Sequence, residues 1–146
     1  MPLTPFIHVR AAKFGVLPGE ADELVNEGMY GKALGLYLVE ALRQRGYDAA
    51  GPLCEDWGWW VGLGGFPFSF GVTIYGAERE GGGLDLYVSD GATDETRFSW
   101  RHFKRVDTGA RSAAERLHAD LVALFQQDGD VEVVSTTLRA PFSDGP

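Results

Sequence analysis

The sequence predicts an α+β fold: a two-layer sandwich in which an antiparallel meander sheet carries two helices on one face, in the order β-α-β-β-β-β-α-β. Three observations lead to this prediction. Segments with alternating apolar and polar residues are joined by glycine-rich turns, which is typical of hairpins. Two other segments, near 30–45 and 112–127, repeat apolar residues every three or four positions, as amphipathic helices do. Aromatic residues concentrate in 55–76, which holds three of the four Trp.

Composition limits the class of protein. The 146 residues suit a single α+β domain, 1–146, whose tail at 139–146 we expect to be loosely ordered. A net charge of −8 argues against nucleic acid as a partner, because phosphate binding requires basic side chains. The sequence has no recognisable signal peptide and no apolar run of roughly 20 residues. We therefore expect a cytoplasmic protein that does not bind membranes.

The first strand is predicted within 5–16, where Ile7 and Val9 alternate with His8 and Arg10 and so face opposite sides.

The first helix is predicted to begin at about Ala21 or Tyr30 and to end at Arg45, before a left-handed cap at Gly46. Gly35 lies inside this helix and is expected to let it approach the sheet closely. The acidic residues before it suit either a helix N-terminal turn or a solvated loop: Glu20, Asp22, Glu23 and Glu27.

Residues 55–76 are predicted to form one hairpin around a two-residue turn at Gly64-Gly65. This turn would place apolar residues opposite one another on one face: Leu63 with Phe66, Val61 with Phe68, Trp59 with Phe70, and Trp57 with Val72. On the other face Trp60 would lie opposite Ser69.

A second hairpin is predicted from 84–89 and 97–102, which flank a turn at 90–95. The matching register pairs Val88 with Phe98, Leu86 with Trp100, and Asp85 with Arg101.

The second helix is predicted to begin at a capping box, Ser112 with Glu115, and to end at Asp128-Gly129. A short last strand follows at 131–134. The buried stripe of this helix is expected at Ala114, Leu117, Leu121, Leu124 and Phe125. One core cluster should contain Trp57, Trp59, Phe68, Phe70, Trp100, Leu121 and Leu124.

Glu55 and Asp56 are adjacent carboxylates beside Trp57. They could act as an acid–base pair, because apolar neighbours raise the pKa of a carboxyl group. Adjacent residues of a strand point to opposite faces, however. We therefore favour an interpretation in which one of them caps the turn and the other is solvated.

The histidines His8, His102 and His118 lack the spacing of a metal site, and Cys54 would need a basic neighbour in space to act as a nucleophile. The single cysteine also excludes an internal disulfide. We expect neither a metal nor a cofactor.

The outer face of the sheet is the better candidate for a binding site. Trp60, Tyr75 and Tyr87 would stand on a floor of small residues, which could bind a flat ligand or another protein. Equally, Trp60 could be covered by the N-terminal segment or by a second copy of the chain. The floor consists of Gly58, Gly62, Ser69, Gly71 and Thr73.

The stretch Glu55-Asp56-Trp57-Gly58-Trp59 follows a predicted helix that ends in Arg45-Gly46-Tyr47. In this the chain resembles small bacterial proteins of unknown function, in which a Glu-Asp-Trp-Gly-Trp stretch opens a central strand. The resemblance extends over residues 28–76 and implies no particular activity.

We therefore expect a non-enzymatic, partner-binding or immunity-type accessory protein that uses its outer sheet face. Its partner would be another protein or a second copy of the chain, as a homodimer. The alternative is a small-molecule binder or enzyme with a site near Glu55, Asp56 and Trp60. A deep cleft that contains Glu55 or Asp56 would favour the alternative. The candidate binding residues are Glu55, Asp56, Trp60, Tyr75 and Tyr87.

Overall fold

The structure, a computed structural model, describes residues 2–92, 96–99 and 104–142. Six strands form the main sheet: β1 (Phe6–Arg10), β2 (Asp48–Cys54), β3 (Trp59–Gly64), β4 (Gly71–Glu78), β5 (Leu84–Asp90) and β8 (Glu132–Leu138). They lie in the order β2-β3-β4-β5-β1-β8, and every neighbouring pair is antiparallel.

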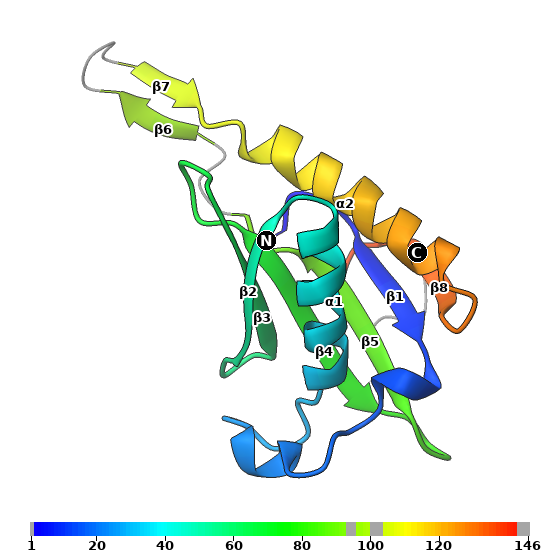
Figure 1. The fold of residues 1–146 in the computed structure, drawn as a ribbon. Helices are drawn as coiled ribbons and strands as arrows, with labels where there is room; N and C mark the ends of the chain where they lie inside the picture. The colour runs from blue at the N-terminus through cyan, green and yellow to red at the C-terminus, as the bar shows by residue number, and fades with distance from the viewer. Residues whose placement is uncertain (1, 93–95, 100–103, 143–146) are drawn as a thin grey trace.

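Two helices, α1 (Lys32–Gln44) and α2 (Ala110–Gln127), pack against the same face of this sheet (Figure 1). Two 3-10 turns, Ala12–Phe14 and Glu20–Glu23, precede α1. The strands β6 (Thr96–Ser99) and β7 (Lys104–Asp107) form a separate ribbon that extends beyond the start of α2 (Figure 1). The predicted α+β sandwich is confirmed, and the elements of the main sheet and its helices follow the predicted order β-α-β-β-β-β-α-β. Neither helix is both long and apolar enough to cross a bilayer; this finding concerns the described residues alone.

The register predicted for 55–76 is wrong. Trp59 pairs with Ile74 rather than Phe70, and Val61 pairs with Val72. The shift is an even number of residues, so the side chains within β3 and β4 keep their predicted faces. The reason lies in the connection 65–70, which is a longer loop than a two-residue turn. Its phenylalanines pack on one another, with ring centroids of Phe66 and Phe70 4.6 Å apart, rather than spreading along a strand.

The second predicted hairpin is also wrong. Strand β5 has β4 on one side and β1 on the other, so neither of its edges is open to 97–102. Val88 pairs with Ile74 and with Ile7 instead of Phe98. Strand β6 pairs with β7. The predicted partners Trp100 and Arg101 lie outside the described residues.

Strand β2 was not predicted, because Ala-Ala-Gly-Pro-Leu-Cys lacks an apolar alternation. It forms an edge of the sheet directly beneath α1. A Cβ added at Gly35 would lie 2.6 Å from the Pro52 Cβ, which confirms that Gly35 allows a close approach of helix and sheet. Helix α1 ends at Gln44, and Gly46 has the expected left-handed φ of 93°.

Helix α2 begins two residues before the predicted capping box. Gly109, with a φ of 86°, precedes its first residue, Ala110, whose N–H donates to the Thr108 hydroxyl at 3.3 Å. Ser112 therefore lies inside the first turn, and the capping-box prediction is wrong. The predicted end before Asp128 is confirmed.

The core lies between the helices and the inner face of the sheet. Trp59 (2% exposed), Phe70 and Leu121 are buried there as predicted, whereas Phe68 and Leu124 are only partly buried. Trp57 is not part of this core, and Trp100 lies outside the described residues. The buried stripe of α2 consists of Ala114, Leu117, Leu121 and Phe125.

Candidate functional site

The Glu-Asp-Trp-Gly stretch is the tight turn between β2 and β3. The backbone N–H of Glu55 donates to the carbonyl of Gly58 at 2.7 Å, which leaves Asp56 and Trp57 at the tip. Asn26 Nδ2 donates to the Asp56 carbonyl at 2.6 Å and ties this tip to the loop before α1.

This turn places Trp57 on the outer face, which corrects its predicted place in the core. The alternation that put Trp57 beside Trp59 holds only within a strand, and β3 begins at Trp59. A Cβ at Gly58 would lie 2.3 Å from the Ile74 carbonyl oxygen, so the chain passes close to β4 at this point. The Trp57 ring instead meets Trp60 and Tyr75.

These rings border an open groove of about 370 Å³ on the outer face of the sheet. We call it the aromatic groove. Strands β3 and β4, the β2–β3 turn, the β3–β4 loop and the chain after β5 all contribute to it. Its lining residues are Glu55, Trp57, Trp60, Ser69, Thr73, Tyr75 and Gly91.

Two glycines hold the Trp60 indole against the sheet. A Cβ at Gly91 would lie 2.2 Å from the Trp60 ring, and a Cβ at Gly71 would lie 2.5 Å from it. The ring therefore occupies space that any other residue type would fill. Its own side chain stays half-buried, so part of the indole faces the groove.

The three rings around the groove lie in different planes. The Trp57 and Trp60 planes are at 88° with centroids 6.5 Å apart, and Tyr75 is tilted by 45° to Trp57 at 5.5 Å. Burial raises the pKa of the Tyr75 phenol above its usual value. Phe142, in the C-terminal segment, packs edge-on against Tyr75 with ring centroids 6.3 Å apart.

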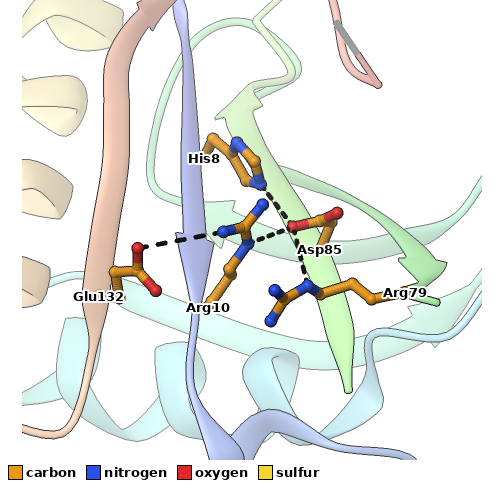
Figure 2. A network of polar contacts seen from close by, with 5 residues as sticks. All are labelled: His8, Arg10, Arg79, Asp85 and Glu132. Carbon is orange, nitrogen blue, oxygen red and sulfur yellow. Dashed lines mark hydrogen bonds and ion pairs between the residues drawn. The ribbon is translucent and has the colours of Figure 1, made fainter. Parts of the chain in front are cut away.

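A polar network lies further along the same face, where β1, β5 and β8 meet (Figure 2). His8 Nε2 lies 2.8 Å from Asp85 Oδ1, and Arg10 Nε donates to the same oxygen at 2.6 Å. Arg79 Nε lies 3.9 Å from it, and Glu132 is 4.0 Å from the Arg10 guanidinium. One carboxylate of β5 therefore contacts two side chains of β1 and the Arg79 side chain, which follows β4.

Partial burial by itself raises the pKa of the Asp85 carboxyl. The hydrogen bonds from Arg10 and His8 outweigh it, and the pKa lies below its ordinary value. The His8 ring is buried and stacks on Tyr87 with centroids 4.4 Å apart. Because His8 and Arg10 of β1 both hydrogen-bond to Asp85 of β5, the network joins these two strands.

The structure brings three of the five predicted site residues together: Glu55, Trp60 and Tyr75 all line the groove. Asp56 lies at the turn tip with its side chain exposed. Tyr87 is buried between His8 and Phe142, outside the groove.

Sequence reasoning missed Trp57 and Gly91 as lining residues, and it missed the His8–Asp85 contact. The outward positions of His8 and Arg10 were a usable signal for the network. Their partner could not be identified, because the pairing of β1 with β5 joins residues nearly eighty positions apart, such as His8 and Tyr87.

The other candidate groups have structural partners. Cys54 Sγ donates to the Glu55 carbonyl, and His118 Nε2 lies 3.0 Å from the Thr136 carbonyl oxygen. His102 lies outside the described residues. Within the described ranges, no three His, Cys, Asp or Glu side chains gather in a way that could hold a metal ion.

A second cavity, of about 400 Å³, lies where the end of α1 meets the start of α2. Two of its polar groups are already paired: Tyr47 donates to Asp120 at 2.6 Å, and Arg45 lies 3.4 Å from the same carboxylate. These contacts join α1 to α2, and we interpret this cavity as part of the packing between the helices. Comparison of the chain with protein-family models, curated proteins and solved structures finds no significant match.

Proposed function

We propose that this chain is a non-enzymatic accessory protein that captures another protein in the aromatic groove. One observation carries the proposal: Trp57, Trp60 and Tyr75 converge on an open groove, although each could have been buried in the core or replaced by a polar residue. Trp and Tyr are the residues that most often provide the binding energy of protein interfaces.

The shape of the outer face supports a protein partner. A smaller cavity of about 140 Å³ adjoins the groove and shares Thr73, Tyr75 and Gly91 with it. Both are open to the surface, so together they form a continuous open depression rather than a closed chamber. Such a surface suits an extended segment or a protruding side chain of a partner better than a fully enclosed metabolite.

The test is site-specific photo-crosslinking in the native cell extract. A benzophenone amino acid is placed at Ser69, on the rim of the groove, and in a matched control at Leu36, which is 48% exposed on α1. We expect a discrete partner to crosslink from Ser69 and not from Leu36. Trp60→Ala in the Ser69 variant should abolish that product.

The captured partner is then purified and its affinity is measured by calorimetry. Loss of one central aromatic anchor should weaken binding by about 2 kcal/mol, or roughly thirtyfold. Equal crosslinking from both positions, or an affinity unchanged by Trp60→Ala, would contradict the proposal.

A second candidate function is the binding or conversion of a small molecule. The groove volume of about 370 Å³ favours it, since it lies within the usual range of ligand pockets, and Glu55 and Trp60 both line it. In that case the Ser69 variant should crosslink no protein. A thermal-shift screen of metabolites should then find a compound whose stabilising effect Trp60→Ala removes.

A further inference from the structure

Apart from Gly91, the residues that line the aromatic groove are aromatic, neutral polar or acidic, and none that the structure describes is basic. Three aromatic residues line it, and Ser69 and Tyr75 are lining residues with neutral hydroxyl groups. Glu55 is the one charged residue among the described residues that line it. No described Lys or Arg lines it.

The Glu55 carboxylate is half-buried. It forms neither a hydrogen bond nor an ion pair with any described side chain, although six contacts between a Lys or Arg and a carboxylate are seen elsewhere among the described residues. Even the exposed carboxylate of Glu23 is paired, with Lys32 at 2.6 Å. A charge-assisted hydrogen bond to Glu55 therefore remains to be made by a group from outside the chain.

The arrangement of the rings also favours a cation, as the Glu55 carboxylate does. Trp57 and Trp60 stand at 88° to one another, and Tyr75 is inclined to Trp57 by 45°. Rings in different planes around one space present more than one π surface to whatever enters. The negative potential of an aromatic face attracts a cation, most strongly for Trp.

The net charge of the whole chain also favours a basic partner. A net charge of −8 steers a basic molecule toward the surface and repels an acidic one.

We propose that the aromatic groove receives a positively charged side chain, an arginine or a lysine, from a basic surface of the partner protein. This inference rests on the proposed function, and it specifies the chemistry of the partner. The cationic head lies among Trp57, Trp60 and Tyr75, and Glu55 pairs with its N–H groups. Thr73 contributes only shape, because its hydroxyl is already hydrogen-bonded to Ser89 at 2.6 Å.

The test uses the full-length chain and a blocked Gly-Arg-Gly peptide as the probe. The matched control peptide replaces arginine with citrulline, which has nearly the same shape and no charge. Binding is followed by NMR through the indole N–H signals of the tryptophans, which are assigned with the Trp57→Phe and Trp60→Phe variants. We expect saturable shifts of the Trp57 and Trp60 signals with the arginine peptide. The citrulline peptide should bind at least about tenfold more weakly.

Two charge variants then distinguish the local effect of Glu55 in the groove from the effect of the net charge of the protein. Glu55→Gln should weaken arginine binding roughly three- to tenfold. Glu40→Gln removes the same charge from the exposed surface of α1 and should leave binding nearly unchanged. Thermal melts of both variants show that the fold is retained.

Equal binding of the two peptides, no shift of the two indole signals, or equal effects of the two charge variants would overturn the inference. The outcomes also separate it from the proposed function. A partner that crosslinks at Ser69 but binds Glu55→Gln as tightly as the parent would leave the proposed function standing and refute the cationic side chain. An arginine peptide that binds in the groove, with no protein crosslinked at Ser69, would refute the proposed function and support a site for a cationic side chain.

Discussion

Trp59 and Trp60 are neighbours in the sequence and have opposite surroundings. Trp59 is buried under α1, where its indole N–H donates to the Met29 carbonyl at 2.9 Å. Trp60 lies half-exposed over Gly71 and Gly91 on the other side of the sheet. The first ring is surrounded by core side chains, and the second contacts mainly backbone and one other indole.

We predict that Trp59→Ala lowers the free energy of unfolding by about 3–5 kcal/mol, because it leaves a cavity and an unpaired carbonyl. Trp60→Ala should cost less, by a margin of about 1–2 kcal/mol. Urea titrations of the two variants, followed by circular dichroism, measure both values. Equal destabilisation would mean that Trp60 is an ordinary core residue.

Glu20 has an unusual role for a residue in a run of acids. Its side chain is fully buried, and its carboxylate accepts hydrogen bonds from the backbone N–H groups of Leu17, Gly31 and Lys32. The last two lie at the start of α1, whose first N–H groups have no partner within the helix. Glu20 therefore caps α1 from twelve positions upstream of Lys32.

We predict that Glu20→Ala lowers the free energy of unfolding by about 2–3 kcal/mol, because three backbone N–H groups, one of them buried, lose their carboxylate acceptor. Glu20→Gln keeps one acceptor oxygen and should cost about half as much. Glu23→Ala is the control, since its exposed pair with Lys32 is worth at most about 1 kcal/mol. Chemical denaturation of the three variants tests the order. A Glu20→Ala variant as stable as Glu23→Ala would show that the cap contributes little.

At the residue scale the sequence placed Trp60 and Tyr75 on one face of the sheet with Glu55 nearby, because residues two apart in a strand share a face, and all three line the groove. It was not informative about Trp57. The face of the sheet on which Trp57 lies depends on where β3 begins. The close approach of Gly58 to β4 sets that point.

At the scale of elements, the network around Asp85 is the main polar contact between β1 and its neighbours. Asp85 lies on β5, and His8 and Arg10 project from β1 toward it (Figure 2). The pKa of the carboxyl is depressed in the folded chain. Its stabilising effect is therefore complete above the ordinary carboxyl pKa of about 4 and is lost as the pH falls through the lower folded value.

We predict that the stability difference between the parent and Asp85→Asn is largest near neutral pH and shrinks below about pH 4. Denaturant titrations at a series of pH values measure the difference. In an Arg10→Leu background the same substitution should show a weaker pH dependence, because the main donor is gone. A difference that stays constant with pH would show that the carboxylate charge is not what joins the strands.

Long, periodic elements could be predicted, and those that depend on distant partners could not. The apolar residues Ala114, Leu117 and Leu121, spaced three and four positions apart, predict helix α2 from local sequence alone. Strand β2 has no such pattern, since its sequence suits an edge strand that is packed closely by a helix. The first hairpin register was wrong because the connection 65–70 is longer than the predicted two-residue turn. The second predicted hairpin was wrong because local matching of apolar residues ignores competition from distant segments, here β1 for the edge of β5.

At the scale of the whole molecule, the C-terminal region has two separable parts. Strand β8 pairs with β1 and buries Leu138, whereas the following turn places Phe142 over Tyr75 and Tyr87. The first part completes the sheet. The second covers a small portion of the outer face, and Phe142 itself is 53% exposed.

We predict that a chain ending after Leu138 folds and melts within a few degrees of the parent. A chain ending after Gly129 should be unfolded or self-associated, because β1 then presents an unpaired apolar edge. Circular dichroism and sedimentation velocity distinguish these outcomes. If both truncated chains fold as monomers, strand β8 is dispensable.

The position of β1 in the sheet also determines the order in which the sheet can be completed. Strands β2 to β5 follow one another along the chain and can pair as each is synthesised. Strand β1 leaves the ribosome before them and must instead wait for β5, and it is then enclosed by β8, so that Phe6 meets Leu138. Contacts this distant in sequence slow folding, because the chain between them loses its freedom before they form. The nascent chain therefore carries an unpaired Phe-Ile-His-Val segment until β5 has been synthesised, and that segment is where a chaperone would first be needed.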